Sequence, residues 1–415
     1  MIETQAQDPF ADIAPPLTVN AALEEAHRCL YCTDAPCMHA CPTHIDVPGF
    51  IKRIASGNMA GSAYLILDAN PMGHSCARAC PVDVLCEGAC VLNERDDAPI
   101  AIALLQRHAT DYALAKDLVL FTPGPDTGRR VAIIGAGPAG LSCAQDLRRF
   151  GHAVTIFEAK PQPGGLNTYG IAEYKLRAPT ALAEAGMVLR LGAELRTGVV
   201  VGRDLSFESL LTSFDAVFVG TGLGLTRRLG IPGEDLPGVV DALTFIETLK
   251  TRRQEAKVGR HVVVIGAGNT AIDAVTQAKR LGAETATIVY RRGEADMSCY
   301  DYEYELAKRD GCGFRFHCTP LEILGSENAR SPLTAHRSPG IVNGLRVATP
   351  DGEATIPCDM VIKAVGQERR AEFAIPDDPR VFTGGDCANG GAEIVNAAAE
   401  GKAAARAIHE MLGAK

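Results

Sequence analysis

Hydrophobic and polar positions follow two different styles along this chain of 415 residues. In the first style, apolar residues recur at helical spacing in short segments, which are joined by loops rich in cysteine and proline. This spacing predicts short helices, and the segments are residues 20–32, 47–58 and 99–116. Residues 1–17 predict a flexible tail, and the two prolines and two glycines of residues 121–130 predict a linker.

The second style begins at Arg130, where apolar runs of strand length precede glycine turns and amphipathic helices. Residues 130–160 predict the order strand, glycine turn, helix and strand, and residues 261–292 repeat that order. Residues 381–412 predict one more strand, glycine loop and helix. The pattern therefore indicates an α/β fold with two Rossmann-like dinucleotide-binding units in one chain.

The first glycine turn follows a predicted strand, residues 131–134, and opens a predicted helix. Its members are Gly135, Ala136, Gly137, Pro138, Ala139 and Gly140. Such glycines permit a tight turn and a close approach of the backbone to a pyrophosphate, which then sits at the helix N-terminus. Glu158 ends the next predicted strand and can accept hydrogen bonds from ribose hydroxyls. These features predict a dinucleotide site.

Two further glycine pairs extend this prediction. Gly164 and Gly165 lie just beyond Glu158 and suggest a second close approach to the ligand. Gly384, Gly385 and Asp386 follow the predicted strand of residues 381–383 and are expected to open the last helix. Asp386 could bond a ribityl hydroxyl, and it could equally serve as a helix N-cap.

The second glycine turn has the same geometry with alanine in its third small position. Its members are Gly266, Ala267, Gly268, Asn269, Thr270 and Ala271. Tyr290, Arg291 and Arg292 follow the next strand, with no acid. Cations there would meet a 2′-phosphate, which slightly favours NADPH over NADH, although the two arginines could also be solvated loop residues. Two dinucleotide sites imply FAD in one and NAD(P)H in the other.

Charge and composition exclude several partners. The net charge is −9 and no block of five or six like charges occurs, so we expect neither nucleic acid nor a polybasic membrane anchor as a partner. No apolar run approaches the ~20 residues of a membrane helix, and the N-terminus lacks the pattern of a signal peptide. We therefore expect a cytoplasmic protein.

Eight of the fourteen cysteines lie within residues 29–90. They form two sets with short spacings: Cys29, Cys32, Cys37 and Cys41, then Cys76, Cys80, Cys86 and Cys90. Pro42 and Pro81 each follow a cysteine, as in bacterial ferredoxins, where the last cysteine of a run ligates the other cluster. Two [4Fe–4S] clusters need eight ligands. Zinc is the alternative, but zinc sites more often use paired CxxC or Cys/His sets.

The ordered motifs together resemble a known family from about Asn20 to the C-terminus. They are the eight-cysteine region, GAGPAGLSC, GGLNTYGI, GAGNTAID, YRR and GGDCANGGAEIVNAAAEGKAAA. The family includes glutamate synthase small subunits, the N-terminal half of dihydropyrimidine dehydrogenase and the separate flavin subunit of bacterial dihydropyrimidine dehydrogenases. The last stretch is most similar to the bacterial dihydropyrimidine dehydrogenase subunit.

This resemblance implies a ligand set for each cluster. One would use Cys29, Cys32, Cys37 and Cys90. The other would use Cys41, Cys80, Cys86 and Gln106, which leaves Cys76 as a non-ligand. The alternative is that all eight cysteines ligate the two clusters and that Gln106 is an ordinary helix residue.

The resemblance also implies nucleotide contacts. FAD would contact the first glycine turn, Glu158, Gly164, Gly165, Leu166, Lys175 and the loop from Gly385 and Asp386. NAD(P)H would contact Gly266, Ala267, Gly268, Asn269, Thr270, Arg291, Arg292 and residues 364–366, including Gly366. Ser298 stands where the NADPH-using mammalian enzyme has an arginine, which tips the expectation towards NADH.

The implied architecture is a helical iron–sulfur domain at residues 1–120, an FAD domain at 130–225 and 345–415, and an inserted NAD(P)H domain at 226–344. The implied function is to pass electrons from NAD(P)H to an FMN-containing, dihydroorotate-dehydrogenase-like partner that reduces uracil or thymine. The chain would therefore work in a hetero-oligomer, with no catalytic nucleophile or general base of its own. The first alternative is a glutamate synthase small subunit.

Two other readings are weaker. A disulfide reductase would carry a redox CxxC near the flavin, and residues 130–415 contain none. A non-enzymatic iron–sulfur scaffold is opposed by the intact glycines of both turns.

Overall fold

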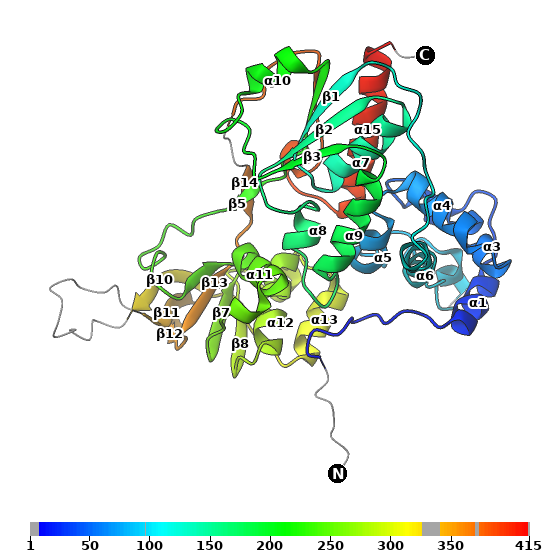
Figure 1. Cartoon of the computed structure of the whole chain (residues 1–415). Coiled ribbons are helices and arrows are strands. Elements are labelled where there is room, and N and C mark those ends of the chain that lie inside the picture. The colour runs from blue at the N-terminus through cyan, green and yellow to red at the C-terminus, as the bar shows by residue number, and fades with distance from the viewer. Residues whose placement is uncertain (1–7, 96, 326–340, 370–372, 414–415) are drawn as a thin grey trace. The chain divides into compact units, whose positions relative to one another are not determined.

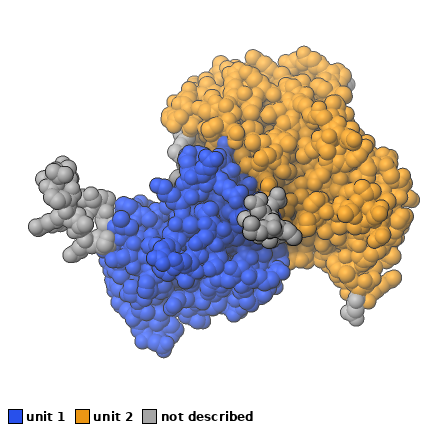
Figure 2. All heavy atoms as spheres, turned by 60° about the horizontal axis from the view of Figure 1, so that its bottom comes forward, with its two compact units in different colours: residues 1–11, 169–174, 225–368 blue, residues 12–168, 175–224, 369–415 orange. Residues whose placement is uncertain are grey.

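The computed structural model describes residues 8–95, 97–325, 341–369 and 373–413. The chain forms two compact units, coloured in Figure 2. The larger unit comprises residues 12–168, 175–224 and 369–415, and the smaller one comprises residues 1–11, 169–174 and 225–368. No helix among the described residues is both long and apolar enough to cross a membrane.

The cysteine-bearing part of the larger unit is helical, as the sequence predicts. Its elements are α1 (Val19–Arg28), α2 (Pro36–His39), α3 (Val47–Ala55), α4 (Met59–Ala69), α5 (Gly73–Ala79), η1 (Val91–Arg95) and α6 (Ile102–Ala115). Polar residues begin several of these helices: the Thr18 hydroxyl accepts from the Ala21 N–H, and the Asp46 carboxylate accepts from the Gly49 N–H. The three helices predicted from the apolar spacing correspond to α1, α3 and α6.

A parallel five-stranded sheet forms the rest of the larger unit, in the order β15-β4-β1-β2-β3. Figure 1 labels β1, β2 and β3 of this sheet. Its strands are β1 (Arg130–Ile134), β2 (Ala153–Glu158), β3 (Glu194–Thr197), β4 (Ala216–Val219) and β15 (Val381–Thr383). Its helices are α7 (Pro138–Arg149), α8 (Leu166–Tyr169), α9 (Ala178–Leu189), α10 (Phe207–Ser213), α14 (Asp386–Asn389) and α15 (Ile394–Met411). One hydrophobic core joins the sheet to the cysteine-bearing helices, since it includes Phe50 of α3 and Ile133 of β1.

The smaller unit repeats the plan with the order β6-β13-β7-β8-β9, again all parallel. Its strands are β6 (Val239–Asp241), β7 (His261–Ile265), β8 (Thr285–Val289), β9 (Gly313–Arg315) and β13 (Met360–Lys363). Its helices are α11 (Ala242–Thr251), η2 (Arg253–Glu255), α12 (Asn269–Arg280), η3 (Glu294–Asp296) and α13 (Asp301–Arg309). An antiparallel sheet adds β10 (Thr319–Gly325), β11 (Val342–Thr349) and β12 (Gly352–Ile356), and β5 (Gly224–Thr226) pairs with β14 (Gln367–Arg369).

The chain order confirms that the second unit is inserted in the first, because β15 returns to the sheet of β1 after β13. The predicted return at residue 345 is wrong. Residues 345–363 still belong to the inserted unit, since β11 and β12 complete its antiparallel sheet and β13 pairs with β6 and β7. The chain leaves that unit after residue 368.

Two smaller expectations also fail. The last helix does not open at Asp386: α14 ends at Asn389, Gly390 takes a left-handed conformation, and α15 begins only at Ile394. The predicted tail is ordered where the structure describes it. Phe10 is fully buried in a cluster with Ala172, Tyr174 and Leu249. Residues 1–7 of that prediction lie outside the described residues.

Candidate dinucleotide sites and cysteine cavities

The first glycine turn connects β1 to α7, and two of its glycines are required by the protein itself. Gly135 has a φ of +100°, and a Cβ there would lie 2.4 Å from the Gly220 carbonyl oxygen. A Cβ at Gly140 would lie 2.0 Å from the Gly135 carbonyl oxygen. Both substitutions would clash with backbone, so these positions fix the turn.

Gly137 differs from these two glycines. It is the N-cap of α7, with extended backbone and no capping side chain, and a Cβ there would meet only the Gly165 Cα, at 3.8 Å. The fold therefore leaves room at Gly137, beside the first turn of α7, where a helix leaves its N–H groups without intrahelical partners. This is the arrangement that a pyrophosphate needs.

Glu158 is buried at the end of β2 and supports the turn. Its Oε2 accepts from the Ala136 N–H at 2.7 Å, and its Oε1 accepts from the Lys160 N–H at 2.8 Å. Burial raises the pKa of the Glu158 carboxyl, and the two N–H donors oppose that shift. Each carboxylate oxygen keeps a second lone pair, so Glu158 can also accept from a ribose hydroxyl.

The other residues expected at the FAD site lie around the same turn. Gly164 and Gly165 have φ values of +108° and +54°, and a Cβ at Gly165 would come within 2.8 Å of the Gly137 Cα. A Cβ at Gly385 would lie 3.1 Å from the Ala139 Cβ, so the late glycine loop also approaches the turn. Leu166 begins α8 and is partly exposed, and Lys175 is buried.

Asp386 follows this late loop and is held within it. Its Oδ1 accepts from the Ala392 N–H at 3.2 Å, and burial raises the pKa of its carboxyl. The Gly385 N–H donates to Glu400 of α15 at 2.6 Å. The expected N-cap role for Asp386 is not observed, because the N-cap of α14 is Gly385.

The second glycine turn opens onto a cavity of about 570 Å³ within the smaller unit. Every residue expected to contact NAD(P)H lines it, namely Gly266, Ala267, Gly268, Asn269, Thr270, Arg291, Arg292, Ala364, Val365 and Gly366. Gly268 is the N-cap of α12, again with extended backbone and no capping side chain. Backbone and cavity therefore fit a second dinucleotide.

Ser298 also lines this cavity, and its loop is bonded to the glycine turn. The Ser298 N–H donates to the Ala267 carbonyl, and the Tyr300 N–H donates to the Asn269 side chain. A Cβ at Gly268 would lie 3.3 Å from the Ser298 Oγ. Ser298 therefore occupies the wall where a longer cationic side chain would reach the nucleotide.

The sequence reasoning missed three cations in the same cavity wall: Arg227, Arg228 and Lys363. Lys363 pairs with Glu234 at 3.0 Å, and Arg228 pairs with Asp235 at 2.7 Å. Arg227, directly after β5, donates its backbone N–H to the Gly366 carbonyl, which holds it beside residues 364–366, expected to contact NAD(P)H. Arg227 and Arg228 are adjacent, but Lys363 lies far from them in the sequence, so no local motif marks the three as lining one cavity.

The eight cysteines of residues 29–90 line two separate cavities of the larger unit. Cys29, Cys32, Cys37 and Cys90 line the first. Cys41, Cys76, Cys80, Cys86, Gln106 and Asn70 are among the residues that line the second. Each implied ligand set is thus brought together around one cavity. Among the described residues, no three His, Cys, Asp or Glu side chains converge closely enough to share one metal ion.

Deprotonation is unfavourable for thiols that line these cavities. Burial and the neighbouring thiols raise the pKa of Cys37 to about 12. The pKa of Cys80 is raised well above its ordinary value. The largest cause is a hydrogen bond with Cys76, and the second is burial. Iron would offset this cost, because a bound metal stabilises coordinating thiolates. Sets of buried and half-buried cysteines around largely apolar cavities therefore fit an iron–sulfur cluster.

Gln106 and Cys76 both reach the second cavity, so its fourth ligand has two candidates. The Gln106 Nε2 donates to the Gly73 carbonyl at 2.8 Å, which leaves its Oε1 as the atom able to ligate iron. The Cys76 Sγ accepts from the Asn70 Nδ2 at 3.2 Å. Cys76 thus already has a hydrogen-bonding role that Gln106 Oε1 lacks.

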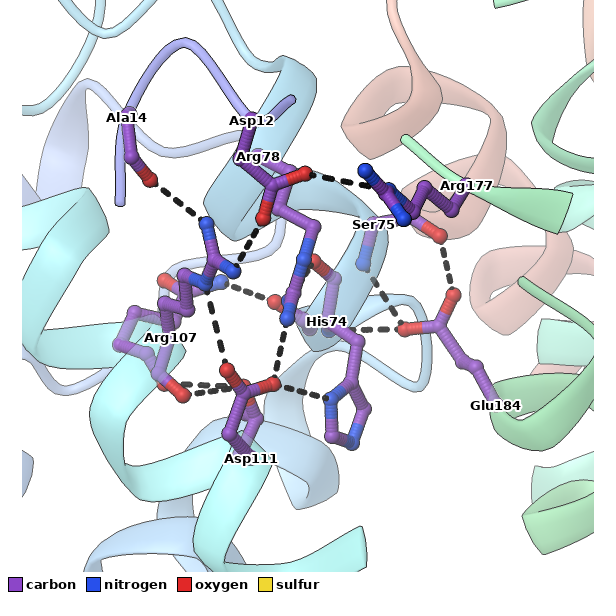
Figure 3. Close-up of polar contacts among 12 residues, drawn as sticks. Asp12, Ala14, His74, Ser75, Arg78, Arg107, Asp111, Arg177 and Glu184 are labelled. Carbon is purple, nitrogen blue, oxygen red and sulfur yellow. Dashed lines mark hydrogen bonds and ion pairs between the residues drawn. The ribbon is translucent and has the colours of Figure 1, made fainter. Parts of the chain in front are cut away.

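Beside the second cavity lies a partly buried network of charged groups that the sequence reasoning also missed (Figure 3). Asp111 of α6 pairs with Arg78 at 2.5 Å and with Arg107 at 3.2 Å. Burial alone would raise the pKa of Asp111, but the nearby His74, Arg78 and Arg107 outweigh it and lower the pKa.

Glu184 of α9 completes this network from the side of the first sheet. It is only 1% exposed, and it accepts hydrogen bonds from the start of α5. The only sequence signal was that Glu184 is the single charged residue of α9.

Comparison with protein families identifies both parts of the chain. Residues 5–118 match the family described as dihydropyrimidine dehydrogenase domain II, 4Fe-4S cluster. Residues 129–401 match the pyridine nucleotide-disulphide oxidoreductase family.

Curated relatives match along nearly the whole chain. The NAD-dependent dihydropyrimidine dehydrogenase subunit PreT of Salmonella typhimurium is 32% identical, with 98% of each chain covered. The glutamate synthase [NADPH] small chain of Escherichia coli is 33% identical, with 97% of this chain and 94% of the relative covered.

Solved structures agree on the fold. Lactococcus lactis thioredoxin reductase superposes with a TM-score of 0.56 at 20% identity, covering 69% of this chain and 99% of that one. FprA of Mycobacterium tuberculosis in complex with NADPH gives a TM-score of 0.55 at 20% identity, covering 70% and 85%. The chain therefore belongs to the pyridine nucleotide-disulphide oxidoreductase family, as an NAD(P)H-dependent oxidoreductase with an N-terminal 4Fe-4S domain.

Proposed function

We propose that this chain is the electron-input subunit of a dihydropyrimidine dehydrogenase. It would take electrons from NAD(P)H and pass them through FAD and two [4Fe–4S] clusters to an FMN-containing, dihydroorotate-dehydrogenase-like partner. That partner would reduce uracil or thymine to the 5,6-dihydropyrimidine. The observation that carries the proposal is that each of two cavities is lined by one full ligand set, in the same compact unit as the flavin-type glycine turn.

The chemistry requires all three kinds of site. NAD(P)H gives two electrons as a hydride, an iron–sulfur cluster accepts one at a time, and a flavin can do both. The residues of this chain would bind and orient: Gly137 and Gly268 admit the two pyrophosphates, and Glu158 holds the first turn and a ribose hydroxyl. No nucleophile or general base is needed in this chain.

The experiment is reconstitution with purified components. Alone, the chain should oxidise NADH with ferricyanide or a viologen dye. It should not reduce uracil, because the proposal assigns the FMN site and the pyrimidine site to the partner. With the FMN subunit added, NADH-dependent uracil reduction should appear. Uracil reduction by the isolated chain would contradict the division of labour.

A glutamate synthase small subunit is the second candidate, because the Escherichia coli small chain is as similar as PreT is. Activity only with a glutamine-hydrolysing partner, seen as NADPH-dependent glutamate formation, would establish that assignment instead. Gln106 favours the pyrimidine function, since the resemblance places an acidic residue there in glutamate synthases.

NADH is proposed as the preferred donor. Ser298 stands in place of an arginine, whereas Arg291 and Arg292 act in the opposite direction within the same cavity. Stopped-flow measurement of kcat/KM for both donors decides between them. A tenfold preference for NADPH would show that the two arginines suffice.

For the clusters, we propose Cys29, Cys32, Cys37 and Cys90 as one ligand set, and Cys41, Cys80, Cys86 and Gln106 as the other. Cys76→Ser should keep all the iron, and Gln106→Leu should change the EPR spectrum of one cluster only. Iron loss from Cys76→Ser, together with a wild-type spectrum for Gln106→Leu, would show that the ligands are all cysteines.

A further inference from the structure

We propose that Glu184 is a positioning residue for the second cluster, whose buried carboxylate fixes α5 and lowers the reduction potential of the cluster beside it. Glu184 belongs to α9, a helix that connects β2 to β3 of the first sheet, whereas α5 belongs to the cysteine-bearing helices. A residue of the nucleotide fold would thus act on electron transfer through a helix that it does not belong to. The inference rests on the two-cluster function proposed above.

The first argument is the geometry of the contact, which Figure 3 shows. Glu184 Oε1 accepts from the backbone N–H groups of His74 and Ser75, at 2.7 and 3.1 Å. Glu184 Oε2 accepts from the Ser75 hydroxyl. The N-cap of α5, Met72, provides no side-chain cap, so Glu184 supplies from another element what the helix lacks.

The second argument is that α5 forms part of the second cavity. The Gly73 carbonyl, at the first position of α5, receives the Gln106 side chain. Cys76 lies one residue after Ser75, and Cys80 is the C-cap of the helix. Displacing the start of α5 would therefore shift Gln106, Cys76 and Cys80, which all line the cavity.

The third argument is charge. The acids Asp111 and Asp12 already pair with Arg78 and Arg107, at distances of 2.5 to 3.2 Å. Burial raises the pKa of the Glu184 carboxyl. Three donors oppose this shift and favour the ionised form: the N–H groups of His74 and Ser75 and the Ser75 hydroxyl. Glu184 therefore adds a negative charge in a place that water does not reach. One-electron reduction adds a further negative charge in the cavity, which a buried anion disfavours.

The test is a redox titration of the anaerobically purified full chain, followed by EPR, with Glu184→Gln as the variant. This substitution preserves shape and removes the charge. One cluster should become easier to reduce, by at least roughly tenfold in its one-electron equilibrium constant, which is about 59 mV. The other cluster should be unchanged. Glu208→Gln, on the exposed surface of α10, is the charge-matched control and should shift neither cluster.

Glu184→Asp keeps the charge and should restore a potential close to wild type, even if the melting temperature falls. If Glu184→Gln does not retain iron, then Glu184→Asp and Ser75→Ala carry the test, because both keep the charge and both should titrate close to wild type. The inference is overturned if Glu184→Gln retains iron with unchanged potentials, or if either charge-keeping variant shifts a potential as far as tenfold. Wild-type chain without iron would instead refute the proposed function.

Discussion

The two parallel sheets of this chain share a backbone plan but differ at one position. Each has five strands with the glycine-turn strand in the middle, β1 or β7. Each turn ends in an extended N-cap glycine, with φ of −79° at Gly137 and −94° at Gly268. In the first sheet, however, the second strand ends at Glu158, which is buried. In the other sheet, the residues after the second strand include Arg291 and Arg292, which are exposed.

From this difference we infer that the backbone of each turn would bind a pyrophosphate, whereas the side chain at or after the second strand would select the rest of the nucleotide. The comparison makes predictions that separate the two sites, because the same substitution in each turn should remove a different ligand.

The largest effect is expected from Gly137→Ala. The added methyl group meets no protein atom closer than 3.8 Å, so the fold should survive, but it fills the space where the pyrophosphate would lie. The chain should purify without FAD and lose all NADH-dependent dye reduction. Flavin content after gel filtration measures this. Gly186→Ala in α9 is the control, since its methyl group enters open space and should leave flavin content unchanged.

Gly268→Ala should have the next largest effect. Its methyl group meets only the Ser298 Oγ, at 3.3 Å, and that hydroxyl can move. FAD should remain bound, while reduction of the flavin by NADH should weaken by at least about tenfold, or 1.4 kcal/mol. Rapid-mixing absorbance measures the rate. Loss of flavin from this variant would contradict the assignment of FAD to the first sheet and of NAD(P)H to the second.

Replacing Arg291 and Arg292 together by alanine should lower kcat/KM for NADPH several-fold and change that for NADH little. The physical reason is that only NADPH carries a 2′-phosphate for these guanidinium groups to bind. Arg228→Ala is the matched control in the same cavity, because Arg228 already pairs with Asp235. Equal losses for both donors would mean that the two arginines bind a part common to both nucleotides.

The smallest effect is expected from Ser298→Arg. The Ser298 side chain lies at the wall of the glycine turn, so an arginine there should reach the nucleotide and raise the ratio of NADPH to NADH efficiency about threefold to tenfold, or 0.7 to 1.4 kcal/mol. Steady-state kinetics with both donors measures the ratio. An unchanged ratio would remove the main argument for NADH.

Much of this fold was predictable from local pattern. A strand, a glycine turn and a helix lie next to one another in sequence, so β1 and α7 could be assigned directly. The end of the inserted unit could not, because β13 is distinguished from a strand of the first sheet only by its partners β6 and β7. The burial of Phe10 likewise depends on residues more than 150 positions away.

The candidate sites, too, were predictable only where they depend on local sequence. Spacing predicted both glycine turns, because each is contiguous in the sequence. Only the resemblance predicted which of the distant cysteines share a cavity. Glu184 could not be assigned, because its role depends on the packing of α9 against α5, over 100 residues earlier in the chain. Arg227 was missed for a related reason: its place in the cavity depends on a backbone hydrogen bond to Gly366.

The central claim is that one chain holds a flavin and two four-iron clusters that NADH can reduce. An anaerobic titration of the purified chain with NADH, with iron and flavin assays and EPR on the same sample, tests it most directly. The account predicts one FAD and about eight iron atoms per chain, bleaching of the flavin, and EPR signals from reduced clusters. One zinc atom and no iron per chain would contradict it.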